Sequence, residues 1–251
     1  MGTMKILAVV AATLLPFGAQ AFDLKTMSDA ERAIFRKEVR AYLLENPQVL
    51  VEAMNVLEQQ QQAMEEQADQ LMLQRNAKAL LEDGISFEGG NPDGDITMVE
   101  FLDYRCGYCR KAHKEVAELL KIDGNIRLIV KEYPILGEAS TAAARMAIAT
   151  LQTLGGDAYS KLHEELMVYD GPMNDKSMRM MAHRAGLDAD AILAQIDGPE
   201  VTDHLAKMHA LGSKMQVTGT PTFVVGSTLL RGYVPLDGMR QIVAAERKIS
   251  E

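Results

Sequence analysis

Two cysteines, Cys106 and Cys109, are the residues of this sequence best suited to chemistry, because they are its only cysteines and just two residues separate them. A disulfide between them would restrain the unfolded chain very little, since the loop it closes is so short. The pair is therefore a poor structural crosslink. It is better suited to reversible exchange, in which a thiolate attacks the sulfur of another disulfide.

The elements expected around the pair favour the same chemistry. Residues 97–104 are typical of a strand and residues 107–121 of a helix, so the cysteines fall where a strand turns into a helix. The free N–H groups and partial positive charge of a helix N-terminus stabilise a thiolate. We therefore expect Cys106, at the tip, to be the attacking sulfur. Cys109, one turn further, should be more buried and should resolve the mixed disulfide.

The cysteine pair has a second interpretation as part of a metal site. Zinc needs four ligands, and the sequence has no second cysteine pair. His113 nevertheless completes a C-x2-C-x3-H set on one helical face, which could hold Cu(I) or zinc because thiolates favour soft metals. Three ligands in each chain are too few for us to expect a metal, and we expect no organic cofactor. Without a metal, His113 is an ordinary, partly exposed helix residue.

Two features further along the chain could assist the pair. Glu100 lies in the middle of the first apolar strand, where a buried carboxylate is costly unless it has a task or a partner. If it faces the cysteine helix, burial raises its pKa and allows it to accept the proton of Cys109. The alternative is a glutamate that faces solvent at a strand edge. Thr220 and Pro221 open a late apolar strand, where a trans proline would fit poorly into a paired strand.

The remaining pattern predicts an α/β domain at residues 84–251. Turn residues mark a linker near 84–95, and a strand–helix–strand unit follows, which predicts a parallel strand pair. Residues 137–216 are almost all helical in character and form a helical insertion. The elements are strands at 97–104 and 126–133 around the helix at 107–121, then helices at 139–151, 157–168, 174–185, 188–196 and 199–215, strands at 222–225 and 228–233 joined by a hairpin, and a helix at about 235–249.

Residues 22–83 have the composition of a helical extension. Ser28 and Glu31 fit a capping box, and Asn46-Pro47 breaks the segment into two helices. Residues at heptad spacing follow the break. They are Leu50, Leu57, Met64 and Leu71, with Met54, Gln61 and Ala68 interleaved. This stripe indicates either a helix that packs on its own domain or an oligomerisation stalk, and we favour the stalk.

The N-terminus has the pattern of a secretory signal peptide. A lysine precedes the apolar stretch at 6–17, and Ala19-Gln20-Ala21 fits a cleavage site. We therefore expect residues 1–21 to be removed and the protein to be periplasmic; an uncleaved anchor or a buried helix is the alternative. The formal net charge is −9, and binding to nucleic acid relies on positive charge, so no nucleic-acid partner is expected.

Three segments resemble a known family. They are VEFLDYRCGYC at 99–109, KEYPILG at 131–137 and TGTPTF at 218–223. With them, about residues 96–250 resemble the DsbA-like thiol–disulfide oxidoreductases of the thioredoxin superfamily, and in particular the ScsC and Com1-type exported proteins. Residues 42–50 look like the N-terminal extension of the same branch.

This resemblance implies a thioredoxin-like fold and a set of roles. Cys106 would be the nucleophile, Cys109 the resolving thiol of the same redox disulfide, and Glu100 the buried acid. Pro221 would be the cis-proline whose loop, with Thr220, offers backbone groups to a substrate chain by strand addition. Gly107 and Tyr108 would be substrate-binding residues beside it. Relatives with a similar extension form oligomers and act as disulfide isomerases, and the Scs group is associated with copper tolerance.

The sequence departs from the family between the cysteines. The strongest oxidants of the branch carry Pro-His there, whereas this chain has Gly107-Tyr108. Tyr108 adds no positive charge near the thiolate, so we expect a less acidic Cys106 and a less oxidising disulfide. Together with the stalk, this favours an oligomeric disulfide isomerase, with a trimer as one option. It would act on exported proteins with cysteines and would be kept reduced by a membrane redox partner. A dithiol oxidase, a copper-binding or copper-tolerance protein, and a surface protein with a vestigial redox fold are the alternatives.

Overall fold

A computed structural model describes residues 26–250 of the chain. The expected signal peptide at 1–21 lies outside the described residues. Contacts within the chain divide it into two compact units, one ending at Gln61 and one beginning at Gln62. The domain boundaries expected at residues 22 and 84 stay predictions.

The first unit consists of helix α1 (Asp29–Glu45) and the first part of helix α2 (Gln48–Leu81). Ser28 caps α1 with the expected capping box, because its side chain accepts the backbone N–H of Glu31 and the Glu31 carboxylate accepts the N–H of Ser28 at 2.8 Å. The helix ends at Glu45 with Asn46 as its C-cap, since the residue before a proline disfavours helical backbone. The expected break between two helices is therefore confirmed.

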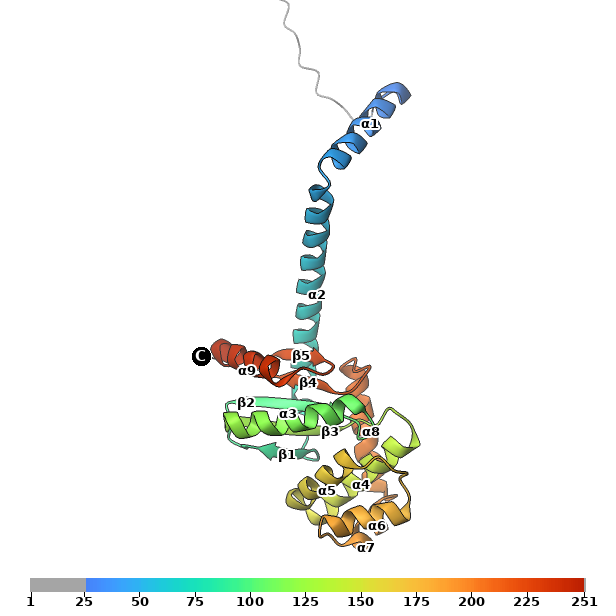
Figure 1. The fold of residues 1–251 in the computed structure, drawn as a ribbon, viewed down its shortest axis with the longest axis vertical. Coiled ribbons are helices and arrows are strands. Elements are labelled where there is room, and N and C mark those ends of the chain that lie inside the picture. Colours follow the sequence, from blue (N-terminus) through green and yellow to red (C-terminus); the bar gives the residue numbers. More distant parts are fainter. Residues whose placement is uncertain (1–25, 251) are drawn as a thin grey trace, which may run out of the picture. The chain divides into compact units, whose positions relative to one another are not determined.

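The second unit is built on a sheet that, within residues 26–250, has five strands in the order β1-β3-β2-β4-β5 (Figure 1). Strands β2 and β3 are parallel, as the strand–helix–strand unit predicts, and the other pairings are antiparallel. The strands are β1 (Phe87–Gly90), β2 (Ile96–Leu102), β3 (Ile126–Glu132), β4 (Thr222–Val225) and β5 (Thr228–Arg231).

Strand β1 lies in the segment that the sequence indicates as a linker. Its residues, FEGG, have no apolar alternation, so the local pattern gives no strand signal. The strand forms because it pairs with β3, and because the ring of Phe87 stacks on Tyr159 with 4.3 Å between ring centroids. Long-range pairing overrides local propensity here.

The two faces of the sheet have separate hydrophobic cores. Met98 and Leu102 of β2 belong to the core beneath α3 (Gly107–Asp123) and α9 (Leu236–Ser250). Val99 and Phe101 belong to the core of the opposite face, which includes Leu73 and Leu80 from the end of α2 and Leu211 from α8 (Pro199–Lys214). Because β2 and β3 are buried on both faces, their sequences are almost continuously apolar.

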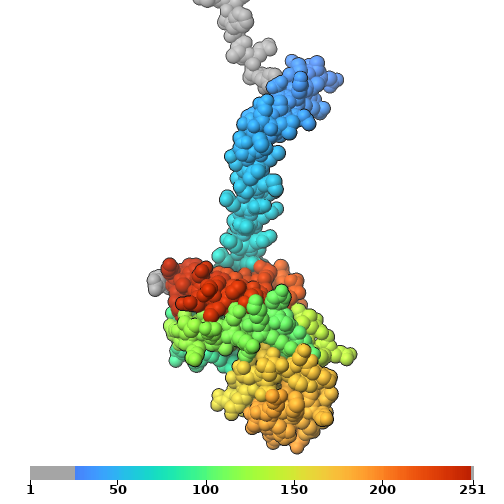
Figure 2. Space-filling view, viewed as in Figure 1, coloured from blue at the N-terminus to red at the C-terminus, as the bar shows by residue number. Residues whose placement is uncertain are grey.

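The helical insertion lies between β3 and β4, as the sequence predicts. In the space-filling view its yellow-to-orange residues gather into a lobe next to the green layer that contains α3, and the red layer that contains α9 lies on the other side of the green one (Figure 2). The alanine-rich α4 allows close approach of its neighbours and is buried along most of its length. The insertion comprises α4 (Glu138–Leu154), α5 (Gly156–Val168), α6 (Asp175–Arg184), α7 (Ala189–Gln195) and α8 (Pro199–Lys214).

Within 26–250, none of the helices combines the length and the apolar character that crossing a membrane requires.

Candidate active site

Cys106 and Cys109 occupy the first turn of α3, where the sequence places them. Cys106 is the N-cap of the helix, and both cysteines are free thiols. Cys106 retains 9% of its surface, whereas Cys109 retains none. The tip position and partial exposure of Cys106 suit a nucleophile, and the burial of Cys109 suits a thiol that acts only after Cys106 has reacted.

The surroundings of Cys106 stabilise its thiolate. A hydrogen bond from the Cys109 side chain is the largest cause, and bonds from the Thr220 side chain and from the backbone N–H groups of Cys109 and Tyr108 add to it. Burial opposes these effects, but together they lower the pKa of Cys106 to about 5. Hydrogen bonds to the sulfur thus favour the thiolate although no histidine lies between the cysteines, and the expectation of a less oxidising disulfide stays a prediction.

Cys109 has the opposite character. The hydrogen bond it donates to Cys106, its burial and the negative charge of Glu100 all raise the pKa of Cys109 well above that of an ordinary thiol. The backbone N–H of Asp103 donates to the Cys109 sulfur at 3.5 Å and only partly offsets this. Cys109 consequently needs a base before it can attack.

Glu100 is the carboxyl that is placed to act as this base. It lies in the middle of β2, between Val130 of β3 and Phe223 of β4, and only 3% of its surface is exposed. The alternative of a glutamate facing solvent at a strand edge is therefore wrong. Burial, and then the negative charge of Glu132, raises the pKa of Glu100 to about 8. Its role as proton acceptor for Cys109 stays a prediction.

The Thr220–Pro221 loop lies against Cys106. The peptide bond between the two residues is cis, as the resemblance implies, and the Cys106 thiol donates to the carbonyl oxygen of Thr220 at 3.1 Å. Two hydrogen bonds hold the loop on either side. The Thr222 hydroxyl donates to Gly219, and the N–H of Gly232 donates to the Pro221 carbonyl.

Comparison with known proteins agrees with this arrangement. Residues 97–244 of the 251-residue chain match the model of the DSBA-like thioredoxin domain, which is more than half of the chain. The chain belongs to this family. Residues 31–63 match a second model, the copper resistance protein ScsC N-terminal domain.

Several individual proteins are similar to this DSBA-like chain. A thioredoxin-like oxidoreductase from Silicibacter pomeroyi is 40% identical with a TM-score of 0.64, over 68% of this chain and 97% of the other. ScsC of Proteus mirabilis, in a transitional conformation, is 25% identical with a TM-score of 0.64, over 89% and 98%. The thiol:disulfide interchange protein DsbC of Escherichia coli is 26% identical, over 71% and 63%. The chain also matches Na(+)/H(+) antiporters NhaA of Salinispora, and spans about a quarter (24%) of their length.

Two stacked aromatic rings, those of Tyr108 and Tyr233, lie beside the cysteine pair of this DSBA-like domain. Tyr108, between the cysteines, is 63% exposed and stacks on Tyr233 with 6.0 Å between ring centroids. Lys111 lies 4.2 Å from the centre of the Tyr233 ring, and the Tyr233 hydroxyl donates to Glu115 at 2.6 Å. Sequence reasoning missed Tyr233, because it follows β5 and reaches α3 only through the fold. Next to these two tyrosines, the space that a side chain at position 107 would occupy is empty, because the residue is Gly107.

The basic residues near the motif are bound to the insertion. Arg110 donates to Asp170 at 3.0 Å and to the Tyr169 carbonyl, and Arg105 donates to the Gly171 carbonyl at 3.1 Å. These contacts hold the loop between α5 and α6 beside the start of α3.

The structure does not assemble the alternative metal site at Cys106, Cys109 and His113. His113 turns toward α5, where its Nε2 lies 3.0 Å from the Glu164 carboxylate. In the part of the chain that the structure describes, no three His, Cys, Asp or Glu side chains are grouped so that they could hold a metal ion.

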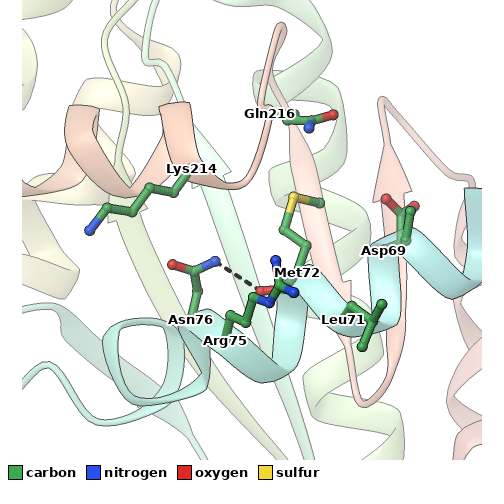
Figure 3. Close-up of a pocket in the computed structure, with 8 residues that line it drawn as sticks. Asp69, Leu71, Met72, Arg75, Asn76, Lys214 and Gln216 are labelled. Carbon is green, nitrogen blue, oxygen red and sulfur yellow. Dashed lines mark hydrogen bonds between the residues drawn. The ribbon is translucent and has the colours of Figure 1, made fainter.

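A groove of about 470 Å³ lies elsewhere on the domain, between α2 and the end of α8 (Figure 3). Cys106 and Cys109 do not line it. The groove is lined by Ala68, Asp69, Leu71, Met72, Arg75, Asn76, Lys214 and Gln216.

Proposed function

We propose that this protein is a thiol–disulfide oxidoreductase that exchanges disulfides with cysteine-containing proteins, and within that class an exported, oligomeric disulfide isomerase. The opposite acidities of Cys106 and Cys109 within one helical turn carry the proposal. Exchange needs one sulfur that is a thiolate at neutral pH and a second that is held in reserve. Membership of the DSBA-like family supports the same activity.

The chemistry begins at Cys106. Its thiolate attacks one sulfur of a substrate disulfide, so that a Cys106–substrate disulfide forms and the other substrate sulfur leaves as a thiolate. In isomerisation a different substrate thiolate then attacks this mixed disulfide. The substrate leaves with a new pairing and Cys106 returns reduced, so no net electron transfer occurs.

Cys109 provides a second reaction that resolves the mixed disulfide. It passes its proton to Glu100 and attacks the Cys106 sulfur, which releases the substrate as a thiolate and leaves the Cys106–Cys109 disulfide. The Thr220–Pro221 loop and the open surface at Gly107 and Tyr108 would hold the substrate backbone during both reactions.

The exposed apolar stripe of α2 supports an oligomer. In the single chain these side chains lie in solvent, and heptad positions of this kind are what a second copy covers in a coiled coil. The match of residues 31–63 to the ScsC N-terminal domain supports the same conclusion. A homo-oligomer, with a trimer as one option, would place several cysteine pairs around one substrate. The exposed fractions are 51% for Leu50, 61% for Met54, 55% for Leu57, 61% for Met64 and 45% for Leu71.

Export and a redox partner complete the proposal. The signal-peptide pattern at 1–21 supports a periplasmic protein, where substrates carry disulfides. An isomerase works only while Cys106 is reduced, so a membrane reductant must supply electrons in that compartment.

One observation favours a second candidate, a dithiol oxidase. Stabilisation of the Cys106 thiolate also stabilises the reduced form of the pair, and this raises the reduction potential. The in-cell oxidation state separates the two functions, because a pair kept mostly reduced acts as an isomerase and a pair kept mostly oxidised acts as an oxidase.

The activity test is the recovery of a misbridged substrate protein by the full chain. We expect the wild-type protein to restore the native pairing and to reduce insulin, and the Cys106→Ser variant to do neither. Cys109→Ser is the matched control, because it keeps the nucleophile and should retain the isomerisation route while losing insulin reduction. A wild-type protein that is inactive in both assays would show that the redox site is vestigial.

A further inference from the structure

Cys109 must lose its proton inside the protein whenever it resolves a mixed disulfide, if the proposed function holds. Cys109 is fully buried, and Glu100 is 3% exposed. Glu100 can take one proton from Cys109, but it must release that proton before the next cycle. A route from Glu100 to water is therefore required.

Glu132 lies next to Glu100 on the same face of the sheet. In the parallel pairing of β2 with β3, Glu100 is level with Val130 and Leu102 with Glu132, so the two carboxyls are diagonal neighbours under α3. Among the described residues, Oε1 of Glu100 and Oε2 of Glu132 have no hydrogen-bond partner. Oε1 of Glu100 and Oε2 of Glu132 are therefore both free to take part in a proton transfer between the carboxyls.

From Glu132 a chain of hydrogen bonds leads away from the cysteines. Its Oε1 accepts from the Tyr104 hydroxyl at 2.8 Å and from the Tyr159 hydroxyl at 2.6 Å. The Tyr104 hydroxyl also lies 2.9 Å from Nδ1 of His163, which places it between a carboxyl and an imidazole. The Tyr159 hydroxyl lies 3.4 Å from that of Tyr104, but its contact with His163 is a stacking of the two rings rather than a hydrogen bond.

The far end of this chain lies beside a pair of residues near the surface. The ring of His163 packs against that of His113 with 4.9 Å between centroids, and His113 Nε2 lies 3.0 Å from the Glu164 carboxylate. The Glu164 side chain is 63% exposed. From Glu100 outward, the groups are therefore the carboxyl of Glu132, the hydroxyl of Tyr104 and the imidazole of His163. The His113–Glu164 pair follows them at the surface.

We propose that Glu132, Tyr104 and His163 form a proton path that connects Glu100 to the surface at His113 and Glu164. These three residues do not touch the sulfurs. They position and reset Glu100, which is the group that accepts the proton of Cys109.

The proton balance is simple in each direction. Glu100 passes its proton to Oε2 of the ionised Glu132, and rotation of that carboxyl turns the proton toward Tyr104. Tyr104, whose O–H turns from Glu132 to Nδ1 of His163, then accepts this proton as it passes its own to Nδ1. The Nε2 proton of His163 then leaves toward the surface. Every intermediate group gains one proton and loses one, so Tyr104 and His163 end unchanged apart from the tautomer of the imidazole.

The acidities along the path suit a relay. Burial raises the pKa of Glu132 to about 8, close to that of Glu100, so a proton moves between the two carboxyls without a large energy difference. Burial lowers the pKa of His163 to about 3, and the nearby His113 adds to this effect. His163 therefore stays a neutral imidazole, which has one donor and one acceptor nitrogen.

Other ionisable groups also face Glu132 and Glu100, and they enter any pH dependence. Asp103 from the end of β2 raises the pKa of Glu132, and Tyr104 and Tyr159 lower it by hydrogen bonding. Cys109 of α3 faces Glu100. Lys131 belongs to the opposite face, where it pairs with Asp83 at 2.7 Å.

The test compares two matched tyrosine variants of the full chain. Tyr104→Phe removes the hydroxyl that joins Glu132 to His163. Tyr159→Phe removes a hydroxyl that donates to the same oxygen of Glu132 but leaves the path intact. The reduced protein is mixed with oxidised glutathione, and acid-quenched samples give the rates at which the mixed disulfide forms and is resolved.

We expect Tyr104→Phe to slow resolution about tenfold relative to Tyr159→Phe, since a positioned proton donor or acceptor contributes at least that much. Formation of the mixed disulfide by Cys106 should keep its rate. The pH profile of resolution should change only in Tyr104→Phe. His163→Gln, which removes the imidazole while keeping a polar side chain, should behave like Tyr104→Phe. If Tyr104→Phe fails to fold, His163→Gln replaces it in the test.

Two outcomes would overturn the proposal. Equal resolution rates and pH profiles in the two tyrosine variants would mean that both hydroxyls only support Glu132, and a wild-type rate in His163→Gln would exclude the imidazole. A wild-type protein that forms no mixed disulfide at all would instead overturn the proposed function, so the two failures are distinguishable.

Discussion

At the scale of single residues, the site depends on the opposite pKa shifts of two cysteines that lie in one helical turn. Cys106 and Cys109 share α3, but the hydrogen bond between them lowers the pKa of one and raises that of the other. The same bond therefore prepares the nucleophile and protects the resolving thiol. Once Cys106 is in a mixed disulfide its thiolate no longer exists, and the bond that held the Cys109 proton is lost with it.

The acidity of Cys106 can be measured directly. The thiolate absorbance of the reduced protein near 240 nm should titrate with a pKa of about 5. In Cys109→Ala the pKa of Cys106 should be higher, because the largest stabilising hydrogen bond is gone. Cys106→Ala should show no titration in the acid range. An unchanged pKa in Cys109→Ala would contradict the assigned role of that bond.

The buried carboxyls predict a pH dependence of stability. Folding raises the pKa of Glu132 from the ordinary 4.5 to about 8, so the folded state holds a proton that the unfolded state releases. The resulting stability is fully present below 4.5 and is lost as the pH rises through about 8. Urea unfolding should show Glu132→Gln gaining stability relative to wild type between pH 5 and pH 8.5 (about the span of that titration). Exposed Glu118→Gln serves as the control substitution, and a difference for Glu132→Gln that stays constant with pH would contradict the assignment.

At the scale of elements, the sheet holds the site through contacts between distant segments. β2 ends just before the cysteines, β4 begins just after the cis-proline, and the two strands pair in antiparallel register. Helix α9 packs with α3 over the same face of the sheet. The position of the helix that carries the cysteines therefore depends on how firmly α9 is attached.

One arginine attaches α9 at two points. Arg247 donates to Asp95, just before β2, at 2.8 Å and to Asp123, at the end of α3, at 2.7 Å. Because these groups are partly exposed, Arg247→Ala should lower the free energy of unfolding by only about 1 kcal/mol. On the same helix, the exposed Arg240 lies 3.8 Å from Asp237, and Arg240→Ala should have almost no effect. Equal costs for the two variants in urea unfolding would contradict this.

Much of this arrangement could be predicted from the sequence, because the signals are local. The strand-to-helix position of the cysteines, the glutamate in the middle of an apolar strand and the order of the elements all follow from neighbouring residues. The missed features are non-local. Strand β1 forms only against β3, Tyr233 meets Tyr108 only across the fold, and Glu132 meets Tyr104 and His163 only after the insertion packs on the sheet.

At the scale of the whole molecule, the second compact unit begins at Gln62, within α2. Leu73 and Leu80, from the later part of that helix, are buried in the core beneath the sheet. The helical extension as the sequence delimits it, residues 22–83, thus includes side chains on which the catalytic domain depends. A truncation that tests the stalk must leave them in place.

We predict that a chain lacking the residues before Gln62 is a monomer in sedimentation experiments. It should keep its insulin-reduction activity but lose most of its ability to correct a misbridged substrate. Removal up to residue 83 serves as the contrast, because the loss of two buried leucines costs about 2–5 kcal/mol each and should unfold the domain. If the shorter truncation corrects substrates as well as the full chain, the stalk has no part in isomerisation.

The two outer strands of the sheet have a consequence for a protein that handles unfolded chains. β1 and β5 are each only four residues long, β1 ends in two glycines, and the Arg231 side chain of β5 is paired with Asp69 of α2. Short and interrupted edges recruit extended polypeptides poorly. In the proposed function a misfolded client adds a strand at the cis-proline loop, and edge-to-edge pairing, the usual beginning of co-aggregation, is disfavoured at the borders of the sheet.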